Sequence, residues 1–532
     1  MTTSSSTPPS APPSDAVQAA LARPETYPHR PPAVEVRETH ISWVFLAGEL
    51  AYKLKKPLVL DFLDYGTPSR RHELCAAEVR LNRRLAPDLY LGVRGVVPVD
   101  GGVELTDEDD PRAVDFVIEM RRYDEDHTLA MRLARGELRR HDVVEVGRVL
   151  ARFHEGAARV TPDRSPVLAA ERRFERNLHE LLGDVEQRGE IERVQSLERF
   201  AHAFVTAHAQ TFVARANRGL IRDGHGDLRA EHVLLGDRVR IVDCVEFDPG
   251  LRELDVADDL AFLVFDLAVC GGERFGQCLV RAYRDAGGDP GPDSLIAFYA
   301  AYRALVRAKV ALVRGAQLPG TSPEHGRQSA HARDLISLAE RYAWKARGPL
   351  TIVVCGVPAS GKSHLAHAVA ELSGLPHLSS DVTRKRLAGL RPTDRAPRDT
   401  YGAEWNERTY SELGRRASRA LADNGGAVVD ATFRHRDDRR AFTAMLDAPR
   451  RVVFIECQAP GPVLAQRAAR REHDRARISD AGPAVVLREQ RKWEPLDEVP
   501  ASAHLTVRTD RPVEQITADV LALLDRRLAE LV

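Results

Sequence analysis

Short runs of alternating hydrophobic and polar residues dominate the first part of the chain. This pattern predicts β-strands over residues 41–46, 49–54, 103–105 and 113–120. A charged stretch over residues 70–85 has the composition of a helix and lies between the second and third of these strands. The pattern therefore predicts a small β-rich lobe that carries one helix.

Longer amphipathic patterns follow this lobe. In residues 143–155 the apolar positions are spaced for one buried helix face, and they are Val144, Val146, Val149, Leu150 and Phe153. We expect a mainly helical lobe. Gly348 and Pro349 end its last helix, and an apolar strand begins at Leu350. A domain boundary is predicted there.

The predicted organisation has three parts. Residues 1–30 are rich in Ser, Thr and Pro, a composition that buries too little apolar surface to offset the entropy of ordering, so we expect a disordered tail. Residues 31–345 form the first domain, with a β-rich and a helical lobe. Residues 349–532 form the second, in which strands and helices alternate as in a parallel α/β sheet.

The second domain opens on a phosphate-binding motif. An apolar strand runs into the sequence Gly-Val-Pro-Ala-Ser-Gly-Lys-Ser at 356–363, and a helix follows directly, which is the context that the P-loop requires. Gly356, Ser360 and Gly361 let backbone N–H groups surround the phosphates of ATP. Lys362 reaches the β and γ phosphates, and the Ser363 hydroxyl binds Mg²⁺.

A carboxylate follows the next predicted strand, over residues 375–379. Because ligands of open α/β sheets bind beyond the carboxyl ends of the strands, Asp381 is a candidate general base for an acceptor hydroxyl. Arg384 could steady the acceptor or a phosphate that it carries. The alternative is that Asp381 only caps the helix over residues 382–387, since Asp is a favoured N-cap residue.

Two further elements complete the predicted P-loop site. The apolar run 427–430 ends in Asp430, as expected of a carboxylate that holds Mg²⁺. The segment 463–477 is rich in arginine, namely Arg467, Arg470, Arg471, Arg475 and Arg477. It could form a lid in which Arg471 stabilises the transferring phosphate, although a solvated helical face would have the same composition.

The first domain carries a second constellation. His225-Gly226-Asp227 and, after a short predicted hairpin, Asp243 have the spacing of a kinase catalytic loop and its metal-binding aspartate. Upstream, Lys53 lies in a predicted strand and could bind the phosphates, paired with Glu78 in the following helix. Lys55 competes with Lys53 for this role. These residues predict a second ATP and Mg²⁺ site.

The two halves resemble known kinase families. Residues 350–510 resemble the polynucleotide-kinase and zeta-toxin branch of P-loop kinases, to which gluconate kinase is related. Residues 35–345 resemble the aminoglycoside-phosphotransferase type of protein-kinase-like fold, in which Asp227 would be the base, Asp243 a metal ligand and Asp259 a structural acid. The whole chain resembles bacterial bifunctional aminoglycoside phosphotransferase and ATP-binding proteins.

The N-terminal half departs from that resemblance in two places. His232 stands five residues after Asp227, where the resemblance implies a metal-binding Asn, and imidazole is a softer ligand for a hard cation. No glycine-rich phosphate loop precedes Lys53, and Ala47-Gly48-Glu49 is its only trace. Both active catalysis and nucleotide sensing therefore stay open for this half.

The composition of the chain limits the classes of binding partner that we expect. The chain has 77 Lys and Arg against 78 Asp and Glu, so no overall charge attracts nucleic acid or membranes. Six scattered cysteines favour reduced thiols in a cytoplasm, and no run suits secretion or membrane spanning. We expect a cytoplasmic phosphotransferase with a small-molecule acceptor. The alternatives are a nucleotide-gated regulatory protein without turnover and a 5′-hydroxyl polynucleotide kinase.

Overall fold

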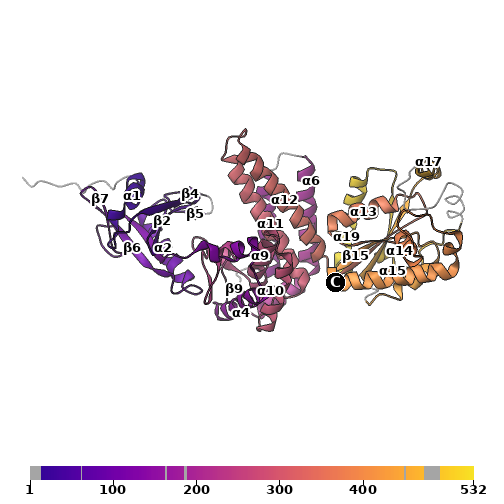
Figure 1. The fold of residues 1–532 in the computed structure, drawn as a ribbon, viewed down its shortest axis with the longest axis horizontal. Coiled ribbons are helices and arrows are strands. Elements are labelled where there is room, and N and C mark those ends of the chain that lie inside the picture. Colours follow the sequence, from indigo (N-terminus) through magenta and orange to yellow (C-terminus); the bar gives the residue numbers. More distant parts are fainter. Residues whose placement is uncertain are drawn as a thin grey trace, which may run out of the picture. The chain divides into compact units, whose positions relative to one another are not determined.

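The computed structural model describes residues 14–60, 63–161, 165–184, 188–447, 451–472 and 492–531. Packing divides the chain into two compact units (Figure 1). The first comprises Met1–Asp163 and Arg215–Gly291, and the second comprises Arg164–Ala214 and Pro292–Val532. The domain boundary at 345–349 was inferred from the sequence pattern alone. It stays a prediction.

A six-stranded antiparallel sheet forms the β-rich part of the first unit. Its order is β1-β2-β3-β8-β6-β7, with bounds β1 (Val34–Glu38), β2 (Ser42–Ala47), β3 (Leu50–Lys55), β6 (Tyr90–Val99), β7 (Gly102–Asp107) and β8 (Asp115–Arg121). Helix α2 (Pro68–Asn82) packs on β6 and β8 and buries Cys75 and Val79 against them. The predicted β-rich lobe with one main helix is therefore present.

The opening residues differ from the expected tail. Helix α1 (Ser14–Leu21) places Val17, Ala20 and Leu21 in the core that β2 and β3 form with Phe45 and Tyr52. The reason is the spacing of these three apolar residues, which fall on one helix face despite the Ser- and Pro-rich surroundings. Residues 1–13 lie outside the described part of the chain.

Small hairpins and helices complete the first unit. They are β4 (Val59–Leu60), β5 (Leu63–Asp64), α3 (Leu129–Ala134), α4 (Arg140–Gly156), β9 (Ile221–Asp223), β10 (Val233–Leu235), β11 (Val239–Ile241), α8 (Pro249–Arg252), β12 (Glu253–Asp255), α9 (Val256–Val269) and α10 (Glu273–Asp285). The buried face of α4 is rotated slightly from the prediction. Val146 and Leu150 are buried, as are Val143 and His154, whereas Val144 and Phe153 are only half-buried.

Five helices come before the P-loop strand in the sequence and belong, wholly or in part, to the second unit. They are α5 (Pro166–Asp184), α6 (Arg188–Ala207), α7 (Ala209–Asn217), α11 (Asp293–Ala316) and α12 (Pro323–Ala346). Helices α11 and α12 pack along each other, and α5 packs on both α6 and α11. Aromatic side chains fill this bundle, with Phe204 stacked on Phe298 at 4.4 Å between ring centroids.

A five-stranded parallel sheet forms the centre of the second unit. Its order is β14-β15-β13-β16-β17, with bounds β13 (Leu350–Cys355), β14 (His377–Ser379), β15 (Gly426–Asp430), β16 (Val452–Gln458) and β17 (His504–Arg508). Figure 1 shows α15 along one face and α13 and α19 on the other. The core residues divide between the two faces in the same way. The predicted fold class is thus confirmed.

The connecting helices follow the alternation of a parallel α/β sheet. They are α13 (Lys362–Ser373), α14 (Ser380–Leu387), α15 (Ala403–Asn424), α16 (Arg436–Thr443), α17 (Gly461–Glu472) and α19 (Val513–Leu531). Because all five strands are parallel, the carboxyl ends of β13, β14 and β15 meet at one edge. This edge carries the predicted P-loop site.

Helix α19 joins the sheet to the helical bundle of the same unit. It packs on α6, and Asp525 of α19 accepts hydrogen bonds of 2.8 and 2.6 Å from Arg347 at the end of α12. The Arg347 guanidinium also lies over the rings of Phe200 and Trp344. Both charged side chains are buried, so this pair fixes α12, α6 and α19 together.

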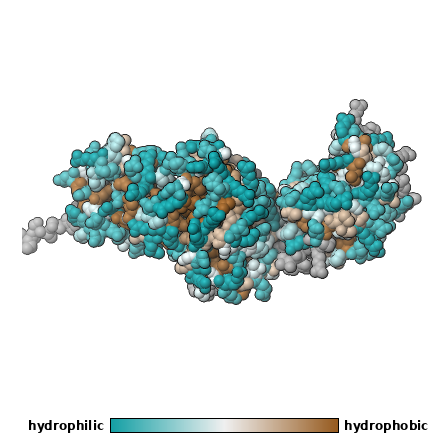
Figure 2. Space-filling view, turned by 60° about the horizontal axis from the view of Figure 1, so that its bottom comes forward, coloured by the Kyte–Doolittle hydropathy of each residue, from teal (hydrophilic) through white to brown (hydrophobic). Residues whose placement is uncertain are grey.

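The surface is mainly hydrophilic on the face that Figure 2 shows, with hydrophobic side chains in scattered patches. Large apolar residues that are exposed, such as Val59 and Leu168, are distributed singly over several elements. Within the described ranges, we find no helix that has both the length and the apolar character to cross a bilayer.

Candidate functional site

The kinase-like constellation of the first unit comes together around Lys53. Its Nζ donates hydrogen bonds of 2.8 Å to Glu78 Oε1 and of 2.8 Å to Asp243 Oδ1. Strand β3 supplies the lysine, α2 supplies the glutamate, and the loop after β11 supplies the aspartate. The three residues that were predicted from distant parts of the sequence therefore form one ion-pair network.

Lys55 has a different environment, which separates it from Lys53. It is 1% exposed, and its Nζ contacts Glu78 Oε2 at 2.6 Å, Tyr65 OH at 3.2 Å and Glu246 Oε1. Every one of these partners is buried. Lys55 therefore supports, from inside the lobe, the loop that carries Asp243 and Glu246. Lys53 lies beside Asp243 and is partly open to solvent.

These charges change the ionisation of one another. The ammonium group of Lys53 is the main cause of an Asp243 pKa well below its ordinary value, and burial opposes it. Burial alone would raise the pKa of Glu78, but Lys53 and Lys55 outweigh it and lower this pKa. The Asp243 carboxylate is therefore kept charged, as metal binding requires, and the Glu78 carboxylate is kept charged for its ion pairs with the lysines.

The predicted catalytic loop is held by a buried acid. Asp259 is fully buried and accepts hydrogen bonds from the backbone N–H groups of His225 at 2.7 Å and Gly226 at 3.0 Å. His154 Nε2 lies 3.1 Å from the same carboxylate. Gly226 has φ 84°, and a Cβ there would lie 3.0 Å from the Leu251 carbonyl oxygen. The fold thus fixes the backbone immediately before Asp227.

His225 is a core residue that positions its neighbour. Its Nε2 donates to the Val242 carbonyl oxygen at 3.0 Å, and its Nδ1 accepts from the Asp227 N–H at 3.3 Å. Burial lowers its pKa to about 4, so the ring is neutral near pH 7. Asp227 itself is half-buried, and its carboxylate is accessible.

His232 connects the two aspartates of the site. Its Nδ1 lies 2.9 Å from the Asp227 carbonyl oxygen, and its Nε2 lies 3.7 Å from Asp243 Oδ2. Asp243 has φ 65°, an unusual conformation for a residue with a side chain, and its N–H donates to Tyr90 OH at 3.3 Å. The loop is thus turned so that the carboxylate faces His232 and Lys53.

The connection between β2 and β3 confirms the departure from a glycine-rich phosphate loop. Ala47 pairs with Leu50, so Gly48 and Glu49 form a two-residue hairpin turn, with φ 65° at Gly48. A turn of this length leaves no loop to fold over phosphates.

Backbone conformation builds the P-loop site of the second unit. Gly356, Ala359 and Gly361 have φ values of 141°, 65° and 88°. A Cβ on Gly356 would lie 2.6 Å from the Cys457 carbonyl oxygen and 2.7 Å from Ser360 Oγ, so only glycine fits there. The Ser360 hydroxyl is buried and has no hydrogen-bond partner among the described residues.

Lys362 and Ser363 begin α13, and Gly361 is its N-cap. The first N–H groups of a helix have no intrahelical acceptor and attract anions. Asp430 lies across from this turn at the end of β15, and its buried Oδ1 has no partner in the described part of the chain. Its other oxygen lies 4.0 Å from His377 Nε2. An unpaired buried carboxylate oxygen suits a cation.

Asp381 lies in the first turn of α14, whose N-cap is Ser379, so Asp381 is not the N-cap. Burial raises its pKa above 3.8, Lys362 opposes this shift, and Asp430 adds to it. Strand β14 ends at Ser379, which pairs with Asp430 of β15, so Asp381 follows the strand end beside the metal-binding candidate. A carboxyl group with a raised pKa beside a phosphate site has the properties of a general base.

Arg384 has a more structural environment than was expected. It is 4% exposed, its Nη1 donates to the Thr400 carbonyl oxygen at 2.6 Å, and its guanidinium lies over the Tyr401 ring at 4.9 Å. Its Nε has no hydrogen-bond partner among the described residues. One face of this group is therefore committed to the loop before α15.

Arg467 reaches the P-loop from α17. It donates to Thr509 Oγ1 at 3.2 Å and to the Thr509 carbonyl oxygen, and Thr509 Oγ1 in turn donates to the Ser360 carbonyl oxygen. Arg471 also lies in α17, but its side chain is outside the described residues, as are Arg475 and Arg477. The lid itself therefore stays a prediction.

Each half thus presents groups that fit ATP and a divalent ion. Considering only the described ranges, no three His, Cys, Asp or Glu side chains gather to hold a metal by themselves. Kinase metals are shared between a few protein ligands and the nucleotide phosphates. Ser363 with Asp430, and Asp243 with His232, fit such incomplete sites.

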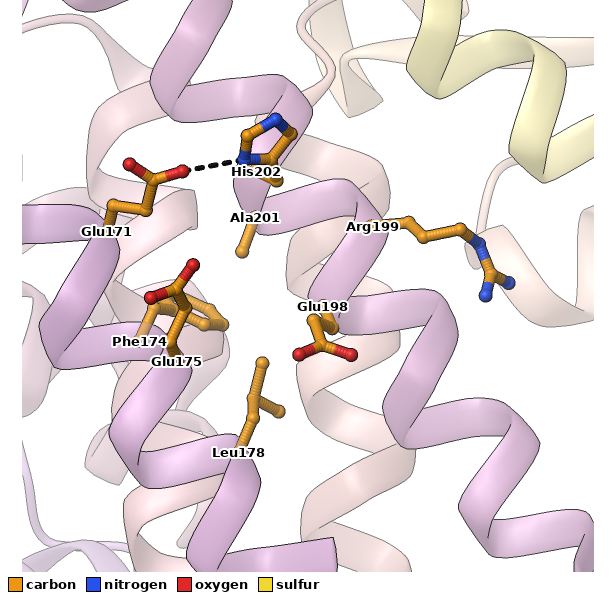
Figure 3. A pocket seen from close by; sticks show the side chains of 8 residues that line it. All are labelled: Glu171, Phe174, Glu175, Leu178, Glu198, Arg199, Ala201 and His202. Atoms are coloured by element: carbon orange, nitrogen blue, oxygen red, sulfur yellow. Dashed lines mark hydrogen bonds and ion pairs between the residues drawn. The ribbon is translucent and has the colours of Figure 1, made fainter.

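Two pockets lie in the second unit. A pocket of about 260 Å³ lies between α5 and α6 and is drawn in Figure 3, where His202 and Glu171 point toward each other. No predicted site residue lines it. A cavity of about 650 Å³ lies beside the carboxyl end of β16, and its lining includes Glu456, Gln458 and Trp493.

The sequence patterns did not single out several residues that support these sites. Glu246 and Tyr65 brace Lys55, His154 contacts Asp259, and Thr509 contacts the P-loop. Of these supporting residues, only Glu246 could have been recognised in the sequence, because it is an acid in an otherwise apolar run three residues after Asp243. The others depend on contacts between segments far apart in the sequence.

Comparisons with known proteins agree with this arrangement. Residues 351–496 match the family described as an AAA domain. Uncharacterized protein Rv2004c of Mycobacterium tuberculosis is 34% identical over 471 residues, which is 87% of this chain and 91% of that protein. Uncharacterized protein Mb2027c of Mycobacterium bovis has the same identity and coverage.

Solved structures of kinases are also similar to parts of the chain. A gluconokinase from Sinorhizobium meliloti is 25% identical, with 35% of this chain and 95% of that chain covered and a TM-score of 0.26. A choline/ethanolamine kinase family protein from Mesorhizobium loti is 18% identical, with 61% of this chain and 98% of that chain covered and a TM-score of 0.38.

Proposed function

This chain belongs to the same family as the mycobacterial proteins Rv2004c and Mb2027c, and from this premise we propose that it is an ATP-dependent phosphotransferase of the bifunctional aminoglycoside-phosphotransferase and ATP-binding type. Its P-loop half transfers the γ-phosphate of ATP to the hydroxyl of a small molecule. The observation that carries the proposal is the position of Asp381 in the first turn of α14, directly after the strand end that pairs with Asp430; burial also raises its pKa. Binding of ATP alone needs no such base.

The P-loop half binds ATP through its backbone. The N–H groups of the turn at Gly361 and of the first turn of α13 bind the phosphates, and Lys362 neutralises the charge that develops between the β and γ phosphates. Ser363 and Asp430 would hold Mg²⁺, which supplies further charge stabilisation when bound. Thr509 and Arg467 keep the loop in shape through the Ser360 carbonyl.

Asp381 then acts on the acceptor. Its carboxylate accepts the proton of the acceptor hydroxyl as the oxygen of that hydroxyl bonds to the γ-phosphorus and the bond to the β-phosphate oxygen breaks. Arg384 orients the loop before α15 and leaves its Nε for the acceptor. Arg471 in the predicted lid excludes water and stabilises the transferring phosphate.

The N-terminal half is a second nucleotide site. Lys53 binds the phosphates, Glu78 orients Lys53, Asp227 is the base, and Asp243 and His232 would hold the divalent ion. The charge network around Lys53 supports this assignment. The alternative role is a sensor that binds nucleotide without transfer, and the short turn at Gly48 favours it because a phosphate-covering loop is missing.

Two rival functions remain for the whole chain. A 5′-hydroxyl polynucleotide kinase would need a basic groove and would lose affinity steeply with salt. The balance of 77 Lys and Arg against 78 Asp and Glu favours a small molecule over a polynucleotide. A nucleotide-gated regulator without turnover would not need Asp381.

Transfer of labelled γ-phosphate to pooled sugars, aminoglycosides, nucleosides and 5′-hydroxyl oligonucleotides tests the proposal. We expect Lys362→Ala to abolish acceptor labelling and Asp227→Ala to leave it largely intact. Loss only with Asp227→Ala would assign the activity to the other half. Labelling of oligonucleotides alone would establish the polynucleotide kinase, and ATP binding without any labelled acceptor would favour the regulator.

A further inference from the structure

The divalent-ion site of the N-terminal half has an unusual donor set. We propose that His232 Nε2 and the Asp243 carboxylate bind the ion together, so that this half selects a first-row transition-metal ion such as Mn²⁺ over Mg²⁺. The inference rests on the proposed nucleotide binding by this half and specifies its metal. It predicts two chemically different metal sites in one chain.

The hydrogen bond of the other ring nitrogen fixes the tautomer of His232. Nδ1 lies 2.9 Å from the Asp227 carbonyl oxygen, and a carbonyl oxygen can only accept. Nδ1 therefore carries a proton, and when the ring is neutral Nε2 presents its lone pair. Metal-binding histidines are commonly oriented in this way by a carbonyl behind the ring.

The Nε2 atom lies near the carboxylates of Asp243 and Glu231. Nε2 lies 3.7 Å from Asp243 Oδ2, which is beyond hydrogen-bond distance. Two ligand atoms about 2.1 Å from a shared ion lie about 3.0 Å apart when they are cis ligands of an octahedral ion, and about 3.4 Å apart at the tetrahedral angle. The observed separation of 3.7 Å exceeds the octahedral value by less than about 1 Å, so a small side-chain movement brings both atoms to one ion.

The site is both rigid and accessible. The His232 side chain is only 10% exposed and is held by Asp227, whereas the Asp243 side chain is 47% exposed. Lys53 contacts the other carboxylate oxygen of Asp243, Oδ1, which leaves Oδ2 on the side of His232. The open side can accept nucleotide phosphates, which would complete the coordination.

Ligand chemistry then decides the metal. Mg²⁺ prefers oxygen ligands in octahedral geometry and gives up its water reluctantly. Imidazole nitrogen suits first-row transition ions, and Mn²⁺ also accepts carboxylate and phosphate oxygens. At the P-loop site the predicted ligands of Ser363 and Asp430 supply oxygen only, which suits Mg²⁺. The difference between the two halves is therefore one imidazole in the ligand set.

Pulsed electron paramagnetic resonance of Mn²⁺ with ADP tests this assignment in the full-length chain. The double variant Lys362→Ala and Ser363→Ala is used to prevent metal–nucleotide binding at the P-loop site. Labelling with ¹⁵N-histidine then shows whether a histidine nitrogen is bound to the Mn²⁺ ion. We expect a histidine nitrogen coupling that His232→Asn removes, together with a loss of at least about tenfold in the preference for Mn²⁺ over Mg²⁺ in ADP-supported binding. His377→Asn, which changes the histidine beside Asp430, is the matched control and should leave both readouts unchanged.

The failures of the two proposals are distinguishable. Mn²⁺ and ADP that bind in an Asp243-dependent manner without a histidine nitrogen coupling would overturn the nitrogen ligand and leave the nucleotide site intact. An Mn²⁺ preference that survives His232→Asn would overturn it as well. Failure of Mn²⁺ and ADP to bind the P-loop-silenced protein, with no effect of Asp243→Asn, would overturn both the metal assignment and the proposed nucleotide role.

Discussion

The two candidate nucleotide sites of this chain are built from different materials. The N-terminal site is a network of charged side chains, in which Lys53, Glu78 and Asp243 bind one another in the absence of a ligand. The P-loop site is made by the backbone, through unusual φ values at Gly356, Ala359 and Gly361. Both arrangements fit a polyanion and its metal.

This difference has an energetic consequence. In the N-terminal site a nucleotide must replace the ion pair of Lys53 with Asp243, so binding exchanges one set of charge interactions for another. In the P-loop site the Oδ1 atom of Asp430 has no hydrogen-bond partner to give up among the described residues. We therefore expect the P-loop site to bind nucleotide more tightly and to be the more sensitive to backbone changes.

The largest expected effect concerns the lysine of the P-loop. Lys362→Ala removes the cation at the transferring phosphate, and we expect phosphate transfer to fall by about a thousandfold. Steady-state kinetics with the identified acceptor measures this change. The equivalent variant of the other half, Lys53→Ala, should reduce the same activity less than about threefold. A similar loss in both variants would mean that the two sites act as one.

The second effect tests the side-chain network. Lys55→Met leaves Glu78 and Glu246 with one buried cation fewer, and we expect about 3 kcal/mol of local stability to be lost. Hydrogen exchange of peptides from β3 and α2 reports this loss. The neighbouring variant Lys56→Met breaks an ion pair with the exposed Glu38 and a cation–π contact with Trp43, and it should cost only about 1 kcal/mol. Equal protection in both variants would contradict the bracing role.

The third effect tests the backbone-built site without changing any charge. Gly361 has φ 88°, and a Cβ there would lie 3.2 Å from Thr509 Cβ, so Gly361→Ala should weaken ATP binding by about tenfold. Calorimetry in a Lys53→Ala background isolates the P-loop site. Gly425→Ala has a similar φ of 75° but meets no atom within 4 Å. It should leave ATP affinity unchanged, and a matching loss there would point to general destabilisation.

The smallest effect concerns the pH dependence of the P-loop activity. The folded pKa of Asp381 is raised above 3.8, and a general base works only when ionised, so kcat/KM should rise with pH through this raised value. Arg384 favours the ionised form, and Arg384→Gln should therefore move this acidic limb to higher pH. An acidic limb that stays in place would separate Asp381 from the proton transfer.

The P-loop was predictable because its chemistry lies in consecutive residues. The motif at 356–363 determines both the turn and the groups that it presents, so the structure adds detail without changing the interpretation. Asp381 was also predictable, since it follows a strand whose carboxyl end faces the same edge. Its exclusion as the N-cap required the structure, because helix ends vary by a residue or two.

The distinction between Lys53 and Lys55 was not available from the sequence. Residues two apart on a strand point to the same side, so both lysines satisfy the pattern equally well. The deciding contact is with Glu246, which is 191 positions from Lys55 in the chain. The P-loop contacts of Arg467 and Thr509 were unpredictable for the same reason. In each case the missing information is a tertiary contact.

The route of the chain between the two compact units limits how this protein could be divided. The chain passes from one unit to the other after Asp163, Ala214 and Gly291, so neither unit is a single stretch of sequence. A gene fragment that begins at the P-loop strand would produce α19 without the surface of α6 on which it packs, and Asp525 without Arg347. Limited proteolysis or recombination at one point therefore cannot release an intact P-loop unit.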